Sequence, residues 1–451
     1  MWNITTIDTS KPLYLAVVEA LERDVRSGTL HPGEQIPTCR KLAQIVGIAP
    51  GTAVRVYREA ENRGLISAVV GRGTFITADA GKRAAVIDVE QDSLKWDMGA
   101  ASPLSKPDPL LSIVARKSLH KDRQSALMTY SDPQGLPEHR GVGADWLARF
   151  GLTVPPKNIV ITAGAQHALW LICHCLFKSG DRIATDHLIY MGMKAAAQDK
   201  GVRLEGLPMD HEGMLPNELE VLCKRQHIKG IYVSGRIQNP TNAPMSHERR
   251  LALCDIIRRH GLLLIENDPQ GFLSDSPDHL LSPMLPAQSI YISSLSKIFL
   301  AGLRIAFVAV PSHLVKPLTQ GIANSMVCVS PLCVEIAAES ILSGYVDETI
   351  QQKQVQIAKR VALFRDIFVG HNFVSSHQSM YVWLPLPHTM SAANLEVDAA
   401  KRNIRIFNSE RFVVGAVPAP EAVRVALTGV ADMPNLRRAL HTLERLVAKT
   451  A

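Results

Sequence analysis

The sequence lacks the features that mark several special classes of protein. No stretch is apolar for long enough to span a membrane, and the start, Met1 to Ile4, has neither the basic region nor the apolar stretch of a secretory signal. Of the 451 residues, only 5% are aromatic and 20% are charged, whereas 46% are hydrophobic, as is usual for globular proteins. We therefore expect a cytoplasmic globular protein that is long enough for more than one domain.

Cysteine is also scarce, and its distribution argues against disulfide and zinc frameworks. The seven cysteines are scattered, and only Cys173 and Cys175 lie close together, with no second pair to complete a zinc motif. This pair falls in an apolar run, 168–177, that predicts a buried helix. We expect reduced thiols in a buried core, and no metal site.

The charge balance is basic, with a formal net charge of +7. A positive excess of this kind suits a nucleic-acid partner. It does not decide the function by itself, because many metabolic enzymes are equally basic.

Composition divides the chain into three regions. Residues 1–78 hold a dense series of short helical patterns, and residues 79–96 are polar with little apolar periodicity, which is typical of a linker. Residues 97–451 alternate helical stretches with short β-branched runs, a pattern that predicts an α/β domain with a mostly parallel central sheet. The runs expected to form strands are 159–161, 182–184, 231–233, 262–265, 289–292 and 305–310.

Three helices are predicted in the N-terminal region. Apolar residues recur at helical spacing over 13–25, and Gly28 is a natural stop for this helix. Thr38 is placed to cap a second helix, and Pro50 suits the first position of a third, which is expected to end at Gly64. Two helices joined by a tight turn form a helix-turn-helix, whose second member enters the major groove of DNA.

A basic hairpin follows these helices. Strand candidates at 65–66 and 74–76 flank Gly71, Arg72 and Gly73, and such a tip suits contacts with phosphates or the minor groove. The alternative is that the segment is a packing or dimerisation module with a solvated basic face. The groove-facing side of the third helix is expected to carry Gly51, Thr52, Arg55 and Arg58.

The N-terminal region resembles the GntR-type winged helix over its whole length. The resemblance implies that double-stranded DNA is a partner and that Arg40, Thr52 and Arg55 contact it, with Arg72 at the tip of the wing. The matching pieces are Pro12–Tyr14, Gly28–Gly33, Gln35–Arg40, Pro50–Thr52 and Gly71–Phe75.

The chemistry of the large region centres on Lys297. It ends the run Ser293–Lys297 and is followed by Gly302, Leu303 and Arg304. A lysine at the end of a strand can form a Schiff base with an aldehyde, while neighbouring hydroxyls and a guanidinium hold a phosphate. The combination is more specific than a lone lysine with two serines.

This region resembles the fold-type I aminotransferases, and in particular the aminotransferase-like half of the MocR-type regulators. The resemblance implies a mixed, mostly parallel central sheet, a small C-terminal subdomain, and pyridoxal 5'-phosphate (PLP) bound through an aldimine at Lys297. It also implies a homodimer. Further motifs that carry it are Tyr130–Gly135, Thr162–Gln166, Asp186–Tyr190, Gln238–Asn242, Glu266–Pro269 and Val423–Val425.

The same resemblance assigns a role to each cofactor residue. Ala165 and Gln166 open the helix that binds the phosphate, together with Ser294, Ser296 and Arg304. Around the ring, Tyr190 is expected to stack on the ring and Asn239 to bind its hydroxyl. Asp268 is expected to keep the ring nitrogen protonated, and Arg424 to bind a carboxylate of the effector.

Three positions depart from the family pattern. Gln270 stands where family members usually have a tyrosine, and Asn242 replaces a glycine. In addition, the register of the motif leaves open whether Asp268 or Asn267 faces the ring nitrogen. Cofactor binding is unaffected by these departures, whereas efficient transamination is in doubt.

The residues therefore predict a ligand-responsive transcription regulator. It is expected to bind DNA as a dimer and to sense PLP, or an amino compound that reacts with it, at Lys297. The alternative is an active PLP-dependent aminotransferase that carries a DNA-binding domain, and Gln270 argues mildly against it. A third possibility, a regulator with an empty pocket, requires Lys297 to be idle.

Overall fold

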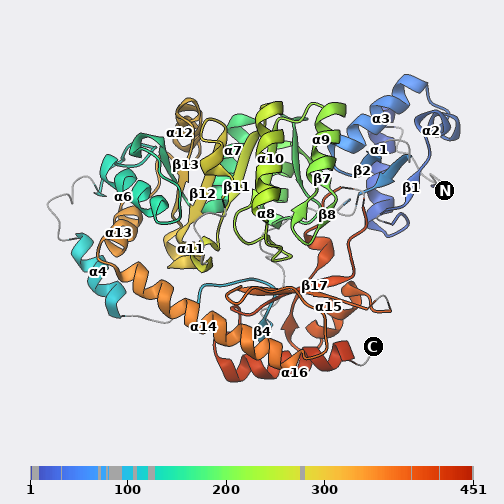
Figure 1. Ribbon diagram of the computed structural model, residues 1–451. Coiled ribbons are helices and arrows are strands. Elements are labelled where there is room, and N and C mark those ends of the chain that lie inside the picture. Colours follow the sequence, from blue (N-terminus) through green and yellow to red (C-terminus); the bar gives the residue numbers. More distant parts are fainter. Residues whose placement is uncertain are drawn as a thin grey trace.

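A computed structural model of the chain shows an N-terminal winged helix beside a larger α/β domain and a C-terminal subdomain (Figure 1). Arg72 and most of the expected linker, 79–96, lie outside the described residues, so the exact domain boundaries stay predictions. The structure describes residues 2, 10–31, 33–69, 73–77, 80, 94–104, 109–119, 127–274, 280–387, 389–415 and 417–448.

The three N-terminal helices form where the sequence predicts them. They are α1 (Leu13–Arg26), α2 (Cys39–Val46) and α3 (Pro50–Asn62). The Thr38 hydroxyl caps α2 by accepting a hydrogen bond from the backbone N–H of Lys41 at 3.4 Å.

A small antiparallel sheet completes the winged helix. Its strands are β1 (Gln35–Ile36), β2 (Ile66–Val69) and β3 (Gly73–Ile76), in the order β1-β3-β2. Apolar side chains from α1, α2 and α3 form a separate hydrophobic core, which includes Val17, Leu21, Leu42 and Val56.

The large domain is organised around a seven-stranded sheet in the order β5-β13-β12-β11-β10-β6-β7. All neighbours are parallel except β13, which is antiparallel to both β12 and β5. The strands are β5 (Ile159–Thr162), β6 (Arg182–Asp186), β7 (Arg203–Leu207), β10 (Gly230–Ser234), β11 (Leu263–Asn267), β12 (Ser289–Ser294) and β13 (Ala306–Ala309). The six predicted strands are all present, and β7 was not predicted.

Helices cover both faces of this sheet, because the side chains of each strand alternate between two buried layers. One face packs against α7 (Ala165–Leu176), α8 (Met191–Lys200) and α12 (Ser312–Met326). The other face is covered in part by α9 (Pro216–Arg225) and α10 (His247–His260). The remaining elements of the large domain are α4 (Pro109–Leu119), α6 (Pro137–Ala148), β8 (Met209–Asp210), β9 (Gly213–Met214), α11 (Leu295–Ile298) and α13 (Pro331–Leu342).

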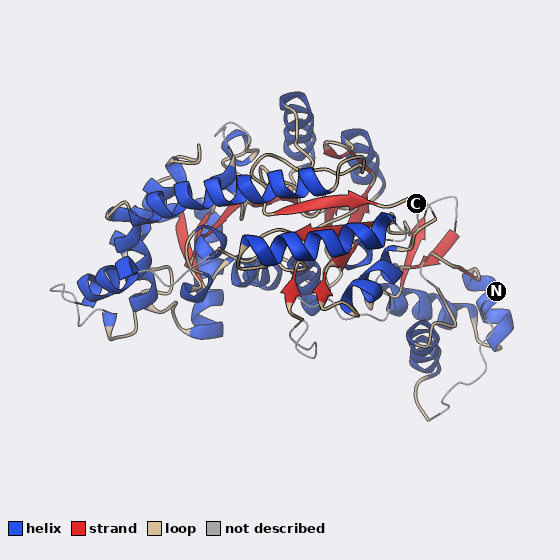
Figure 2. Cartoon of the chain, turned by 90° about the horizontal axis from the view of Figure 1, so that it is seen from below, coloured by secondary structure: helices blue, strands red, loops and turns tan. Residues whose placement is uncertain are grey.

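The long helix α14 (Tyr345–Ile367) leads into the C-terminal subdomain, which has an antiparallel sheet in the order β14-β17-β16. Figure 2 shows helices of this subdomain lying across its strands, with the C-terminus at the end of one of them. Its elements are β14 (Tyr381–Pro385), α15 (Ala392–Ala400), β15 (Ile404–Arg405), β16 (Phe407–Asn408), β17 (Ala422–Ala426) and α16 (Met433–Ala448).

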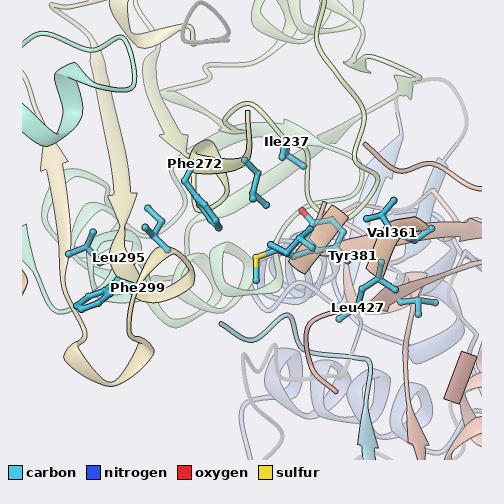
Figure 3. Packing of buried hydrophobic residues seen from close by; sticks show 14 of the residues in the cluster. Ile237, Phe272, Leu295, Phe299, Val361, Tyr381 and Leu427 are labelled. Carbon is cyan, nitrogen blue, oxygen red and sulfur yellow. The ribbon is translucent and has the colours of Figure 1, made fainter. Parts of the chain in front are cut away.

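One hydrophobic core joins the large domain to this subdomain. Phe272 and Leu295 from the large domain lie in the same cluster as Val361, Tyr381 and Leu427 (Figure 3). The chain also crosses between them at β4 (Trp96–Asp97), which pairs in parallel with β15. Trp96, the last residue of the expected linker, therefore pairs with the C-terminal subdomain. Within the part of the chain that the structure describes, no helix combines the length and apolarity needed to cross a membrane.

We expect Leu42→Ala to unfold the winged helix at a lower temperature, because Leu42 is only 1% exposed in its core. A buried Leu→Ala change costs about 2–5 kcal/mol. Ile45→Ala is the matched control, since Ile45 lies on the same helix and is 42% exposed. Calorimetry of the full chain checks this. An equal loss of stability in the two variants would contradict the assigned core.

Candidate cofactor and DNA-binding sites

The expected phosphate site forms where β5 turns into α7. The first N–H groups of a helix have no acceptor within the helix, so the N-terminal turn at Ala165 and Gln166 suits an anion. The turn needs Gly164, whose φ is +82°, because a Cβ there would lie 2.6 Å from Nη2 of Arg304. The Arg304 guanidinium thus lies directly beside this helix start.

Lys297 comes from α11, the short helix that follows β12. Its amino group is largely buried and donates a hydrogen bond to the carbonyl of Ala101. Burial, together with the positive charges of Arg424 and Arg304, lowers the pKa of Lys297 to about 8. A lysine with such a pKa is neutral in a substantial fraction of molecules near neutral pH, and the neutral amine is the nucleophile.

Two serines connect Lys297 to the phosphate site. The hydroxyl of Ser294 accepts a hydrogen bond from the backbone N–H of Ser296 at 3.3 Å. The hydroxyl of Ser296 accepts one from Nη1 of Arg304 at 2.9 Å. The serines, Arg304 and the start of α7 therefore lie together.

Tyr190 lies beside the same helix start. Its ring and the Gln166 amide both crowd Gly192, where a Cβ would collide with them. Burial raises the pKa of the Tyr190 phenol, while Arg424 and Arg304 act on it in the opposite direction. The amide of Gln166 donates to the carbonyl of Gly192 at 2.9 Å, and its own oxygen has no partner among the described residues.

Arg424, from β17, is buried in an aromatic cage. Its guanidinium carbon lies 5.0 Å from the ring centre of Tyr381 and 4.7 Å from that of Phe412. Nη1 donates to Oδ1 of Asn239 at 2.8 Å, and Nη2 donates to the carbonyl of Gly99 at 2.7 Å. Burial lowers the pKa of Arg424 to about 10.

No carboxylate of the described residues forms an ion pair with Arg424, and its Nε has no hydrogen-bond partner there. A buried guanidinium of this kind is costly unless an anion neutralises it. The arrangement therefore suits a ligand that carries a carboxylate.

Asp268, to which the resemblance assigns the ring nitrogen, binds Arg236 and Tyr291 in the structure. It is 2% exposed, and its Oδ2 accepts hydrogen bonds from Arg236 Nη1 and, at 2.9 Å, from the hydroxyl of Tyr291. Its Oδ1 accepts from the backbone N–H of Arg236 at 3.3 Å. The carboxylate is thus bound on the sheet face to which Tyr291 points, and α7 and Ser294 belong to the other face.

Gln270 has a structural role that the sequence did not reveal. Its amide donates to the hydroxyl of Tyr381 at 2.8 Å, and its oxygen accepts from the backbone N–H of Met380 at 3.1 Å. The residue thereby holds the start of β14 against the large domain. The sequence analysis also did not identify three other groups at the site, namely Tyr381 and the backbone carbonyls of Gly99 and Ala101. A tyrosine in an apolar strand is expected to be a core residue, and a backbone carbonyl leaves no signal in the sequence.

The residues predicted to contact DNA that the structure describes come from α2 and α3. Arg40, Arg55 and Arg58 are exposed, and Thr52 is half-buried. The guanidinium of Arg55 stacks on the ring of Tyr14 at 4.2 Å, which fixes its direction. Arg72 lies outside the described residues.

The winged helix contacts the large domain through charged groups. Nη1 of Arg203, at the start of β7, donates to Oε2 of Glu61 in α3 at 3.0 Å. A cavity of about 830 Å³ lies between the two domains. Its lining includes Arg63 from the winged helix as well as Gln166 and Trp170 from α7.

Comparisons with known proteins agree with both halves of this description. Residues 13–76 match the gntR family of bacterial regulatory proteins, and residues 93–443 match the aminotransferase class I and II family. The "Uncharacterized HTH-type transcriptional regulator YdeF" of Bacillus subtilis is 31% identical over 447 residues, which cover 99% of this chain and 96% of that protein. The "HTH-type transcriptional regulator TauR" of Rhodobacter capsulatus is 26% identical over 326 residues, covering 64% and 66%.

Solved structures confirm the fold of the large domain. An archaeal alanine:glyoxylate aminotransferase superposes with a TM-score of 0.72 at 24% identity, covering 83% of this chain and 95% of that one. The α-aminoadipate aminotransferase LysN of Thermus thermophilus, solved with N-(5'-phosphopyridoxyl)-L-leucine, has a TM-score of 0.69 at 22% identity, covering 87% and 99%.

The fold and the matches define a GntR-type DNA-binding domain joined to a fold-type I aminotransferase domain. The chain belongs to the MocR-type regulators, which combine these two families. It is a DNA-binding transcription regulator whose large domain takes PLP as its cofactor. The buried lysine and the anion site beside Arg304 fit that group.

The lowered pKa of Lys297 predicts how PLP uptake depends on pH. Only the neutral amine attacks an aldehyde, so the rate of uptake should rise with pH and level off above about 8, where Lys297 is deprotonated. An ordinary lysine would keep gaining rate to about pH 10. Stopped-flow absorbance of the cofactor-free protein measures this, with Nα-acetyl-lysine as control. A protein profile that follows the control would contradict the lowered pKa.

Proposed function

We propose that this regulator senses PLP, or an amino compound that reacts with it, through an aldimine at Lys297. The supporting observation is the pKa of Lys297, lowered to about 8 within a site that also gathers Arg304, Ser296 and the start of α7. The ε-amine bonds to the aldehyde carbon, and the carbonyl oxygen leaves as water. An amine effector then exchanges with Lys297 on that carbon, which returns the lysine as a free amine.

The effector is proposed to carry a carboxylate. Among the described residues no carboxylate lies within ion-pair distance of the buried Arg424, on which Asp97 acts from further away. Asn239 and the Gly99 carbonyl hold its guanidinium in place. A planar guanidinium held in this way favours bidentate recognition of a carboxylate. An amine of the same size without a carboxylate would leave the charge of Arg424 uncompensated.

DNA is proposed to be read by Arg40, Thr52 and Arg55, with Arg72 at the wing. We further propose a homodimer, because two identical winged helices match the two half-sites of a two-fold symmetric operator. The domain boundaries proposed for this assembly are 1–78, 79–96 and 97–451. Binding of the effector would alter the relative placement of the two winged helices and thereby the affinity for the operator.

The experiment that tests this function is a visible absorbance spectrum with added PLP, for the wild type and Lys297→Ala. The wild type should show the band of the Schiff base, and the variant should lack it. Arg40→Ala is the matched control, since it should keep the band and lose operator binding. If Lys297→Ala kept the band, the lysine would not be the attachment point. If the wild type lacked it, the sensing proposal would fail.

Arg424→Gln tests the carboxylate of the effector. Loss of a buried ion pair should weaken the binding of an amino acid at least tenfold, or about 1.4 kcal/mol, measured by the shift of the visible band. Arg411→Gln is the control, because Arg411 stacks on Phe407 in the same region but pairs with Glu396 at 2.7 Å. A decarboxylated amine should bind both Arg424→Gln and the wild type weakly. Equal affinity of the wild type for amino acid and amine would argue against the carboxylate.

A further inference from the structure

Two polar residues, Asn267 and Asp268, follow one another where β11 ends, and only one of them can point to the cofactor face of the sheet. Successive side chains of a strand point to opposite faces. Asn267 pairs with Ser234 in β10 and with Ile292 in β12. Ile292 lies in the hydrophobic cluster that packs against α7 and α8. Asn267 therefore points to the face that carries the phosphate site and Tyr190.

Asn267 has a hydrogen-bonding atom that the described residues leave unsatisfied. The side chain is 3% exposed, and Nδ2 donates to the hydroxyl of Tyr232 at 3.3 Å. Its Oδ1 has no partner among the residues that the structure describes. A buried polar atom without a partner costs about 1–3 kcal/mol, so the amide is expected to exchange its partners when a group binds beside it.

The neighbours of Asn267 connect it to the cofactor site. Tyr232, its hydrogen-bond partner, interacts electrostatically with Tyr190. Tyr190 in turn interacts with Arg304 and Arg424 and crowds Gly192 together with Gln166. The unpartnered Oδ1 of Asn267 thus lies among the residues that surround the expected ring.

Asp268 cannot take this place without breaking its own contacts. Both of its oxygens accept hydrogen bonds from Arg236, and Oδ2 also accepts from Tyr291. A Cβ at Gly271 would collide with the carboxylate, so the backbone closes around it. Breaking a buried ion pair costs about 3–5 kcal/mol.

We propose that Asn267, and not Asp268, faces the ring nitrogen of bound PLP, and that the nitrogen therefore stays uncharged at neutral pH. This inference rests on the proposed function and deepens it. An amide carries no charge to hold a proton on the ring, whereas a carboxylate does. The hydroxyl of Tyr232 can donate as well as accept, so the Asn267 amide can turn over. Its oxygen then accepts from Tyr232, and its NH₂ faces the neutral ring nitrogen.

The consequence is a site that binds without rapid turnover. A protonated ring nitrogen accepts the electron pair left when a C–H bond of a bound amine breaks, and a neutral one accepts it less well. Asn267 would leave covalent binding at Lys297 intact and slow the later proton removal. Because the bound amine is converted slowly, it stays in the site long enough to act as an effector.

The test is ¹⁵N NMR of the full-length protein loaded with ring-¹⁵N PLP. The wild type should give the signal of an unprotonated pyridine at neutral pH, and Asn267→Asp should move it upfield to the protonated position. Asp268→Asn is the matched control, because it removes the neighbouring carboxylate and should leave the wild-type signal in place. A protonated nitrogen in the wild type, lost in Asp268→Asn, would overturn the proposal.

The visible band separates this result from the proposed function. Absence of the band in the wild type would defeat the proposed function before the nitrogen is examined. A band with a protonated nitrogen would defeat only the role of Asn267. If Asn267→Asp failed to fold, the wild-type signal alone, followed across neutral pH, would still decide.

Discussion

The ion pair between Arg236 and Asp268 holds together the strand ends on which the cofactor site depends. Arg236 follows β10, Asp268 follows β11, and Tyr291, which also bonds to Asp268, lies in β12. Arg236 reaches further, to the carbonyl of Phe150. Each partner is almost fully buried, so the two charges depend on one another and on the hydrogen bonds around them. The ion pair thereby fixes the register of three strands whose ends carry the binding residues.

The site above this ion pair is dominated by positive charge. Lys297, Arg304 and Arg424 act on one another or on Tyr190 electrostatically, and burial strengthens these interactions. Burial lowers the pKa values of both Lys297 and Arg424, and the positive charges of Arg424 and Arg304 lower that of Lys297 further. A ligand with a phosphate at one end and a carboxylate at the other would neutralise the charge of Arg304 and that of Arg424 at the same time. Selectivity for such a ligand follows from charge as much as from shape.

Much of the fold could be predicted from the sequence, because local signals and the global fold agree. Thr38 caps α2, Pro50 starts α3, and the β-branched runs mark the core strands. The resemblance also placed Lys297, Arg304 and Arg424 within one site. These residues sit in motifs whose chemistry requires particular side chains at fixed spacing.

The remaining features of the site could not be read from the sequence. Whether Asn267 or Asp268 points to the cofactor depends on where β11 ends, and an offset of one residue reverses the face. The carbonyls of Gly99 and Ala101 reach Arg424 and Lys297 through chain segments about 200 or more residues apart, and any residue type supplies a carbonyl. From the sequence, Gln270 is only the replacement of a tyrosine that family members usually have. In the structure it binds Tyr381 and Met380 and so holds the start of β14 in place.

The ion pair between Glu61 and Arg203 also affects how salt acts on this protein. It joins the end of α3 to the edge strand β7 of the large domain, and both side chains are partly exposed. Mobile ions weaken such a pair, just as they weaken contacts with DNA phosphates. Salt therefore acts on the winged helix twice, once at its contacts with DNA and once at its contact with the large domain. Counting displaced counterions from a salt titration would then overstate the number of phosphates that this regulator touches.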